Sequence, residues 1–574
     1  MKSEQKNLVL AIVLSAIILG VFEIAFKPTI VAQQRAYVET SKQEYVAHQQ
    51  EIEKNSRPVV ERAASMNAVK RVAFHNGRIS GSINLQGGRI DDVTLTNYRE
   101  TVDPTSPNIV LLSPENTKTG YYSEFGWVKT GDANPVLPNG DTIWRADKTE
   151  LTAAQPVTLT YDNGQGLEFQ KTYTLDQDYM ITVTQTVRNK GNTPVSLVPY
   201  ALIARYYEHH GRDFFVLHEG LLGVLDGTLQ ETRYKDIRET QKQEFTSTGG
   251  WLGITDKYWL AALSPMADQP IKARFAYSKV KNDDRYQTDY TLPEQKIAPG
   301  QSATAVNRFF AGAKEVKLLD RYEKESNIPR FDLAVDFGWY YFLTKPFFLL
   351  LHFLYTLLGN FGIAILVLTV IVKGVMFPLA NKSYHTMNKM KELQPELIKL
   401  REEYGQDPLR LQKEMAAFYQ KNQINPLAGC LPIFIQIPVF FSLYKVLFVS
   451  IEMRHQPFFG WIHDLSAPDP TTIFNLFGLI DWAPPAYFLF IPLHVGAWPI
   501  IMGFTMWLQQ RLNPAPMDSA QRVVFGLFPY LFTFMLSSFP AGLVIYWSWS
   551  NLLGILQQYA IKRHKIGPDA HKPV

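Results

Sequence analysis

Residues 359–379 read GNFGIAILVLTVIVKGVMFPL, and this stretch decides how the rest of the chain is interpreted. Lys373 is its only charged residue, and its length matches the roughly 20 residues that an α-helix needs to cross a bilayer. A lysine near the centre of such a helix costs roughly 2.5 to 3.5 kcal/mol, so it normally faces a wet cavity or a polar partner. The stretch therefore predicts a membrane-spanning helix whose lysine has polar surroundings.

Lys373 also has a simpler interpretation, in which its side chain reaches the nearer membrane surface. It lies about six residues before the end of the predicted helix, roughly 9 Å by helical rise, and a lysine stem covers much of that distance. Other polar residues in apolar segments favour a shared cavity: Thr369, Gln436, Tyr546, Ser548, Ser550 and Asn551. Each alone is more typical of a hydrogen bond between two helices, so both interpretations stay open from the residues alone.

Further windows without charged residues cover 7–22, 422–444, 482–510 and 523–561. The last is too long for one helix and is interrupted by SSFPAG at 537–542, a place for a tight turn. We therefore expect a polytopic α-helical membrane protein with six spans, one N-terminal and five C-terminal.

The first apolar window has two possible fates. Residues 7–22 follow Lys2 and Lys6, as in a signal peptide, but no small-x-small cleavage site follows them. We therefore expect residues 1–30 to remain as a transmembrane anchor. A polar linker is expected at 31–65, because that stretch is rich in Gln and Glu.

Residues 66–325 predict one large β domain. Hairpin dipeptides recur at Asn76-Gly77, Gly87-Gly88, Asn139-Gly140 and Asn163-Gly164. In the run ITVTQTV at 181–187, three threonines alternate with Ile181, Val183 and Val187, as expected for a strand with one buried face. A domain of this size with such strands predicts a β-sandwich.

The boundaries after the β domain follow from charge and apolar length. The segment RFDLAVDFGWYYFLTK at 330–345 mixes charges with aromatics, which predicts an amphipathic helix in the membrane interface. The expected units are 326–358 interfacial helix region, 359–379 second span, 380–424 helical hairpin, 425–448 third span, 449–485 loop, 486–510 fourth span, 511–522 loop, 523–561 fifth and sixth spans and 562–574 basic tail.

The distribution of Lys and Arg predicts the orientation. Residues 380–421 hold eight of them, and more lie in the 511–522 loop and the tail, whereas Arg454 is the only one between the third and fourth spans. Basic loops stay in the cytoplasm. Both termini are therefore expected to be cytoplasmic, and the β domain periplasmic in a bacterial inner membrane.

The 380–424 segment predicts a helical hairpin of its own. Met390, Leu393, Leu397, Leu400 and Tyr404 are spaced three and four apart, the seam of a packed helix. Asp407 and Pro408 then predict the N-cap and first residue of a second helix, which continues the seam at Leu411, Met415 and Phe418. The hairpin is either an ordinary solvated helix pair or a docking arm.

Composition excludes several classes of function. The net charge of +4 is too small to indicate a specific nucleic-acid partner. Cys430 is the only cysteine, so no intramolecular disulfide is possible. The chain contains no GxxxxGK[ST] loop, so a mechanism without ATP is expected, and no cofactor, metal or catalytic residue is expected.

Several segments together resemble the YidC insertase family, which includes the Oxa and Alb insertases of organelles, in its Gram-negative form with a large periplasmic domain. The resemblance covers nearly the whole chain. Its motifs are the 359–379 stretch, MKELQPELIKLREEYG at 390–405, NPLAGCLPIFIQIPVFFSLY at 425–444, FFGWIHDLSAPDP at 458–470 and FPAGLVIYWSWSNLLGILQQ at 539–558.

The resemblance implies a five-helix core around a hydrophilic groove, and a periplasmic domain of the mutarotase-type supersandwich. Lys373 occupies the position of the family's positive groove residue, and Thr369, Gln436 and Tyr546 match other groove positions. Phe440, Met502 and Phe532 match a hydrophobic slide for the arriving helix. The family usually has arginine where this chain has Lys373; a lysine can lose its proton in a dry site, and we expect a hydrated groove to keep it charged.

The resemblance also implies function and partners. The chain is expected to insert and help fold integral membrane proteins, alone or with the Sec translocon. Its partners are expected to be nascent integral membrane proteins, the Sec translocon, the lipid bilayer and the ribosome, the last through the cytoplasmic loops and tail.

Two other functions remain as alternatives. An ion-coupled transporter would show internal repeats, which we do not find. A carbohydrate enzyme would need acid and base groups in the β domain. The only local cluster is Arg205-Tyr206-Tyr207-Glu208-His209-His210, in which strand alternation places Glu208 and His210 on one side.

Overall fold

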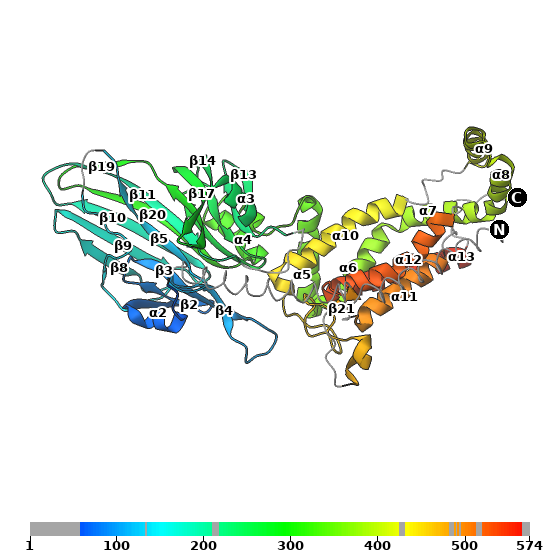
Figure 1. Cartoon of the computed structure of the whole chain (residues 1–574), viewed down its shortest axis with the longest axis horizontal. Helices are drawn as coiled ribbons and strands as arrows, with labels where there is room; N and C mark the ends of the chain where they lie inside the picture. Colours follow the sequence, from blue (N-terminus) through cyan, green and yellow to red (C-terminus); the bar gives the residue numbers. More distant parts are fainter. Residues whose placement is uncertain are drawn as a thin grey trace, which may run out of the picture.

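The computed structural model describes residues 58–131, 135–208, 217–423, 431–480, 487–488, 491–492, 495–512 and 519–564. The anchor predicted at 1–30 and most of the 31–65 linker lie outside these residues. The described chain forms a β domain and a helical part that extends away from it, and the two lie end to end (Figure 1).

The first sheet of the β domain has 11 strands among the described residues. Its main path, in spatial order, is β14 Lys242–Thr248, β17 Pro270–Val280, β18 Asp283–Thr291, β11 Val195–Arg205, β5 Tyr121–Lys129, β3 Arg89–Arg99, β2 Ile79–Asn84, β1 Arg71–His75 and β7 Glu150–Leu151. β19 (Gln295–Ile297) pairs with β11, and β4 (Asn108–Leu112) pairs with β3. Among the strands that the structure describes, only β1 and β7 pair in parallel.

The second sheet has nine strands among the described residues. Its order is β13 Thr228–Arg233, β12 Gly220–Leu225, β15 Trp251–Thr255, β16 Trp259–Pro265, β20 Ser302–Ala313, β10 Met180–Asn189, β9 Leu167–Leu175, β8 Val157–Asp162 and β6 Arg145–Ala146. Short helices lie before the first strand and after β13: α2 Arg62–Ala68 and α3 Tyr234–Thr240.

The two sheets pack face to face, in agreement with the predicted sandwich. Phe125 of β5 contacts Phe309 of β20 edge to face, with ring centroids 6.3 Å apart. The Tyr290 hydroxyl of β18 donates to Asn307 Oδ1 of β20 at 2.7 Å. The alternation predicted for β10 is confirmed, because Ile181, Val183 and Val187 are buried and the threonines between them are half-buried.

Three of the four predicted turn dipeptides join neighbouring strands. Asn76-Gly77 lies between β1 and β2, Gly87-Gly88 between β2 and β3, and Asn163-Gly164 between β8 and β9. Both Gly87 and Gly88 have positive φ, which a side chain would strain. Asn139-Gly140 instead lies in the long connection between β5 and β6.

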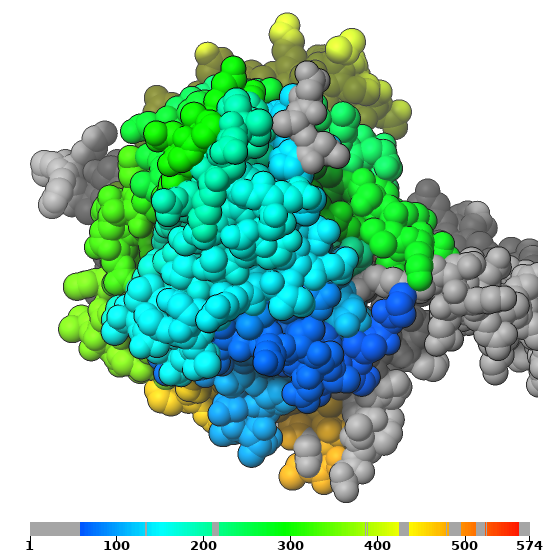
Figure 2. All heavy atoms as spheres, turned by 90° about the vertical axis from the view of Figure 1, so that its left-hand side faces the viewer, coloured from blue at the N-terminus to red at the C-terminus, as the bar shows by residue number. Residues whose placement is uncertain are grey.

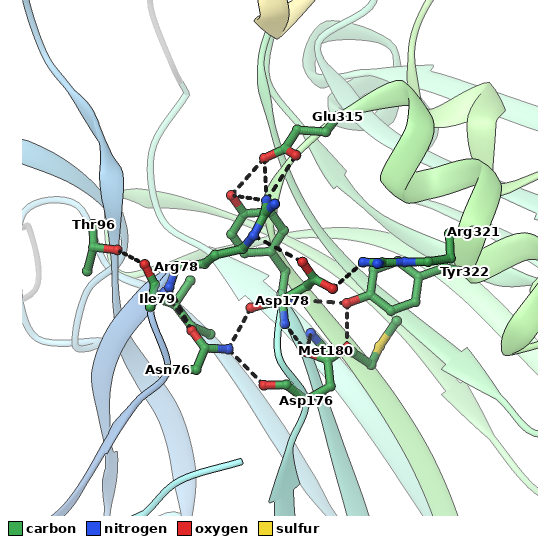
Figure 3. Close-up of polar contacts among 12 residues, drawn as sticks. Asn76, Arg78, Ile79, Thr96, Asp176, Asp178, Met180, Glu315, Arg321 and Tyr322 are labelled. Atoms are coloured by element: carbon green, nitrogen blue, oxygen red, sulfur yellow. Dashed lines mark hydrogen bonds and ion pairs between the residues drawn. The ribbon is translucent and has the colours of Figure 1, made fainter.

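Helix α4 (Val316–Glu325) ends the β domain and is fastened to it by charged groups (Figure 3). Arg78, from the β1–β2 turn, contacts Glu315 at 2.7 Å and Asp178 at 3.0 Å. The Tyr322 hydroxyl of α4 donates to Asp176 at 2.5 Å. The start of α4 is therefore held by two turns of the sandwich.

The segment predicted as one amphipathic helix at 330–345 is not one helix. A 3-10 turn, η1 (Phe331–Ala334), is followed by a bend at Gly338, whose φ is +70°, and helix α5 (Tyr341–Leu358) begins only after it. The outer face of α5 carries exposed Phe342, Phe353 and Leu357. These exposed side chains of α5 are apolar, and the interfacial position of the 326–358 region stays a prediction.

The remaining helices form the rest of the helical part. They are α6 Phe361–Val375, α7 Phe377–Glu392, α8 Gln394–Tyr404, α9 Pro408–Lys421, α10 Leu431–Val449, α11 Ala497–Leu512, α12 Ser519–Leu536 and α13 Ala541–His564. Between α10 and α11 lie η3 Ile451–Met453, η4 Ile473–Gly478 and a short pair of strands, β21 Tyr487–Phe488 and β22 Ile491–Pro492.

Among the described residues, α5 alone is one unbroken helix long and apolar enough to cross a membrane. α6 and α7 would make a second spanning helix if the pair is counted as one span, but the angle between them is 60°. The six-span arrangement therefore stays a prediction. α12 and α13 turn back on each other through 537–540, within the interruption seen in the sequence.

The α8–α9 hairpin lies at the far end of the helical part from the β domain (Figure 1). Asp407 caps α9 as predicted, since its Oδ1 accepts from Arg410 N at 3.1 Å, and Pro408 is the first helical residue. The first helix, however, is broken at Leu393, between α7 and α8. Pro395 explains the break, because it has no N–H to continue the preceding helix and favours a position in the first turn of a new helix.

Polar contacts join the β domain to the end of α10. Lys445 of α10 pairs with Asp336 at 2.9 Å. Arg454, after η3, donates to Arg99 O at 2.7 Å and lies over the Trp259 ring at 5.5 Å. The β domain and the helical part are thus connected through α10 as well as through the chain between α4 and α5.

Candidate functional site

A stripe of small and polar residues runs along one face of α13. Tyr546, Ser550, Gly554 and Gln557 are spaced four, four and three apart, so they lie above one another on the helix. Tyr546 and Ser550 are buried, although the helix lies in an otherwise apolar bundle. Buried polar groups need partners, and these come from neighbouring helices.

Gln436 of α10 is the partner of Tyr546, and its Nε2 donates to the tyrosine hydroxyl at 2.9 Å. Two of the four predicted groove residues, far apart in the sequence, are therefore in direct contact. Tyr546 is 2% exposed and Gln436 is half-buried, so the pair joins the packed bundle to its surface.

Lys373 lies in the last turn of α6, beside the C-terminal part of the same stripe. Gln557 of α13 donates to Lys373 O at 3.4 Å, and Trp549 of α13 donates to Leu366 O at 3.2 Å. Within the described part of the chain, the half-buried ammonium of Lys373 has no carboxylate partner. The carbonyl end of α6 favours a cation at this position.

Thr369 lies one turn before Lys373 but is not open to a groove. It is 1% exposed, and its hydroxyl donates to Ile365 O of its own helix at 2.6 Å. Such a bond satisfies the hydroxyl without a partner from another helix. In this conformation Thr369 therefore offers no polar group to a client.

α13 packs against α11 along one edge of the stripe, since a Cβ at Gly554 would lie 2.8 Å from Gln509 Nε2 of α11. Asn551 donates to Thr505 Oγ1 at 3.3 Å. α11 in turn packs closely on α12, because a Cβ at Gly503 would lie 1.9 Å from Thr533 Oγ1. Any groove along the 546–557 stripe is therefore bounded on one side by the packed α11–α12–α13 unit.

The three residues predicted for a hydrophobic slide lie near Trp547, which the sequence reasoning missed. Phe440 and Phe532 both contact the Trp547 ring system, with centroids 4.7 Å and 5.4 Å away, and both phenylalanines are half-buried. Met502 is 0% exposed and packs on Leu536 and Val544. Phe440 and Phe532 thus present surface, whereas Met502 supports it from within.

A simple signal could have found Trp547 and Gln557. Both lie on the same helix as Tyr546, one residue and eleven residues after it, and helical spacing alone assigns Gln557 to the tyrosine's face. Partners such as Leu366 O, in contrast, are backbone groups that no residue type indicates.

In the β-domain cluster that was considered as a candidate enzyme site, charged side chains form ion pairs. Glu208 bonds to Arg238 and to the Tyr286 hydroxyl, and fully buried Arg205 pairs with Asp256 at 2.7 Å. His209 and His210 lie outside the described residues. The carboxylate of Glu208 therefore makes structural contacts.

One acidic group in the described chain has the spacing of a metal site: Asp320, Glu323 and Asp332. The ammonium of Lys345 lies between two of them, 2.8 Å from Asp320 and 2.6 Å from Asp332. A lysine thus supplies the positive charge that a metal would bring, and the cluster is an ion-paired joint between α4, η1 and α5.

Two family models together match most of the chain. Residues 71–350 match the YidC periplasmic domain, and residues 353–568 match the 60Kd inner membrane protein. The insertase YidC of Bradyrhizobium diazoefficiens is 53% identical over 519 residues, which cover 88% of this chain and 84% of that protein. That of Nitrobacter hamburgensis is 47% identical over 582 residues, 98% of this chain and 96% of that protein.

A solved structure, described as an active YidC insertase with its first transmembrane domain resolved, has 16% sequence identity and a TM-score of 0.35. The match covers 89% of this chain and 95% of the solved chain. The relatives at about half identity extend over both the β domain and the helical part. The chain therefore belongs to the YidC family, as an inner-membrane protein of the membrane protein insertase type.

Proposed function

We propose that this chain inserts integral membrane proteins, and helps them fold, through a hydrophilic groove between α6, α10 and α13. The observation that carries the proposal is the Gln436–Tyr546 hydrogen bond, together with Lys373 and Gln557 further along the same stripe. These groups place polar atoms from three helices side by side in an apolar bundle. Polar and ionisable groups inside a membrane are costly and normally face a partner or a water-filled cavity.

Polar groups in a membrane lower the barrier for a client's polar segment. Such a segment crosses hydrocarbon at high cost, because its hydrogen-bonding groups lose water. Partial passage along the half-buried Lys373 and Gln436, with Tyr546 as the buried hydrogen-bond partner of Gln436, replaces part of the lost hydration. The client's apolar helix then enters lipid with favourable free energy, so insertion needs no ATP, and long hydrophilic segments are expected to be poor substrates.

The aromatic group of Phe440, Trp547 and Phe532 is the proposed exit path. It begins beside Tyr546, since the rings of Phe440 and Tyr546 lie 6.5 Å apart. It continues to α12, where Phe528 contacts Phe532 at 5.9 Å. A client helix leaving the polar stripe would therefore meet apolar rings before lipid.

The proposed orientation places the β domain in the periplasm and both termini in the cytoplasm. Two observations support it: the 71–350 match to a periplasmic domain, and the position of the α8–α9 hairpin at the opposite end of the molecule (Figure 1). The hairpin lies in the segment with eight basic residues. We propose that it and the basic tail contact the ribosome and that the helical part works alone or beside the Sec translocon.

Depletion tests this function directly. The cell's own copy would be depleted, and insertion of a small two-span membrane protein would be followed by protease accessibility, with the Sec channel active or blocked. We expect insertion to fail on depletion in both conditions and to return when this chain is expressed. Unchanged insertion after depletion would contradict the proposal.

A further inference from the structure

The loop around η4 presents large apolar side chains to the outside at one end of the helical part. Residues 470–480 contain no charged residue. Five large apolar side chains there are between 37% and 86% exposed: Phe474, Leu476, Phe477, Leu479 and Ile480. A group of this kind on a protein surface marks an interaction site.

The backbone of this loop holds its tip outward. Leu476 and Phe477 both have left-handed backbone angles, with φ of 50° and 59°. Bulky residues rarely adopt this conformation, so surrounding contacts must impose it. Phe477 N donates to Thr472 O at 2.8 Å, and Ile480 N donates to Asn475 O at 3.0 Å. The loop is therefore closed on itself and not folded into the bundle.

The base of the loop is fixed to the first turn of α11. Asp469 Oδ2 accepts from Trp498 N at 2.9 Å, and Thr471 Oγ1 accepts from Ala497 N at 3.0 Å. Asp469 is 4% exposed, and a Cβ at Gly496 would lie 2.5 Å from its carboxyl carbon. This packing fixes the height of the apolar tip relative to the membrane helices.

Exposed tryptophans indicate where the membrane surface lies. Trp461, which donates to Asp469 Oδ1 at 3.1 Å, is 43% exposed, and Trp339, just before α5, is 99% exposed. Exposed tryptophans at helix ends are typical of the membrane interface. On α11 the exposed apolar surface continues at Ile501 and Phe504, one to two turns after the loop's anchor.

The β domain leaves this region uncovered. In Figure 1 the yellow-orange turn drawn below the β21 label, whose colour corresponds to residues near 475, projects downward from the helical part. Figure 2, seen from the β-domain side, shows orange atoms at the lower rim of the molecule, beyond the β domain's strands. The described tip is thus free to reach a planar partner beside the bundle.

We propose that residues 473–480 insert among the acyl chains of the outer leaflet and anchor the periplasmic end of α11 in the bilayer. Lipid is the occupant that fits, because the loop is apolar and uncharged, lies at the interface and continues the apolar surface of α11. The anchor resists tilting of the α11–α12–α13 unit when a client moves along the neighbouring helices. It rests on membership of the membrane-protein family and not on the groove.

Lipid-borne quenchers test the anchor. In full-length protein with Cys430→Ser, a single cysteine at Leu479 would carry an environment-sensitive fluorophore. The protein would be reconstituted in phosphatidylethanolamine and phosphatidylglycerol vesicles containing lipids with a quencher on the upper acyl chain. We expect a blue-shifted emission and several-fold stronger quenching than for the same label at Ile143, an exposed β-domain residue.

A label at Ile501 serves as the reference for correct reconstitution, since the proposal places it in lipid. Strong quenching at Ile501 with only Ile143-like quenching at Leu479 would overturn the proposal. A photocrosslinker at Leu479 in cells adds a second readout, in which lipid adducts are expected. A single protein adduct without lipid quenching would show that the loop docks a protein instead.

Discussion

The backbone N–H of Val316 donates a 3.0 Å hydrogen bond to Glu452 Oε1, so a carboxyl group from the helical part caps the last helix of the β domain. Val316 is the first residue of α4, where N–H groups lack helical acceptors and attract an anion. Glu452 is a half-buried residue of η3, just after α10, and its Oε2 atom is out of contact with solvent. Within the described chain, its Oε2 accepts no hydrogen bond.

This burial makes the contact sensitive to pH. Burial raises the pKa of Glu452 from 4.5 to about 7, and nearby Glu315 adds to the rise, while the backbone hydrogen bonds and Lys317 oppose it. The folded protein therefore holds the proton more tightly than the unfolded chain. The stabilising contribution is complete below about pH 4.5 and is lost as the pH rises through about 7.

Glu452→Gln is expected to remove this dependence. An amide keeps the acceptor for Val316 N but carries no charge, so thermal stability above about pH 7 should rise toward its value near pH 5. Thermal unfolding of the purified full chain at a series of pH values measures this. Glu244→Gln, at a 64% exposed carboxylate in β14, is the control and should leave the profile unchanged. An identical profile for wild type and Glu452→Gln would contradict the assignment.

The Lys345 joint gives a second prediction. Lys345→Met leaves Asp320 and Asp332 facing each other without the ammonium; Asp332 is buried and Asp320 is half-buried. We expect the free energy of unfolding to fall by roughly 2 kcal/mol, between the values for surface and buried pairs. Adding Asp320→Asn should restore part of the loss. If Ca²⁺ binds tightly to wild type, the cluster is a metal site and this interpretation is wrong.

The Gln436–Tyr546 contact gives a third prediction. A double-mutant cycle with Gln436→Leu and Tyr546→Phe should show a coupling energy of about 0.6 kcal/mol, typical of hydrogen bonds between membrane helices. Each single variant should also slow client insertion. Stability is measured by unfolding in mixed micelles and insertion in vesicles. Coupling without any change in insertion would make the pair purely structural.

Structural features that depend on residues close together in the sequence could be predicted. The N-cap at Asp407, the alternation of β10 and the turn at 537–540 each depend on a few neighbouring residues, and the structure contains all three. The contact between Gln436 and Tyr546 could not be derived from local chemistry, because 110 residues separate them. Their polarity within apolar segments and the family resemblance place them in one groove, and that groove stays a prediction.

Features that depend on tertiary contacts could not be predicted. The segment at 330–345 has an amphipathic composition, but the bend at Gly338 brings the backbone against Lys445, since a Cβ there would lie 3.1 Å from its Cε. The apolar spacing from Met390 to Tyr404 continues without interruption across the helix break before Pro395, so the spacing does not indicate that break. Met502 has the residue type of a slide, but packing against α12 and α13 buries it.

The charge of Lys373 is the central claim, and one measurement tests it most directly. Purified wild type, Lys373→Arg and Lys373→Ala would be reconstituted in vesicles, and the insertion rate of a two-span client with a short hydrophilic segment would be followed. Val375→Ala, a 78% exposed neighbour in the same helix turn, is the matched control.

The account predicts similar rates for wild type, Lys373→Arg and Val375→Ala, because each keeps one positive charge beside the polar stripe. Lys373→Ala should be slower by about tenfold, which corresponds to about 1.4 kcal/mol of lost stabilisation. Insertion by Lys373→Ala at the wild-type rate would contradict the account.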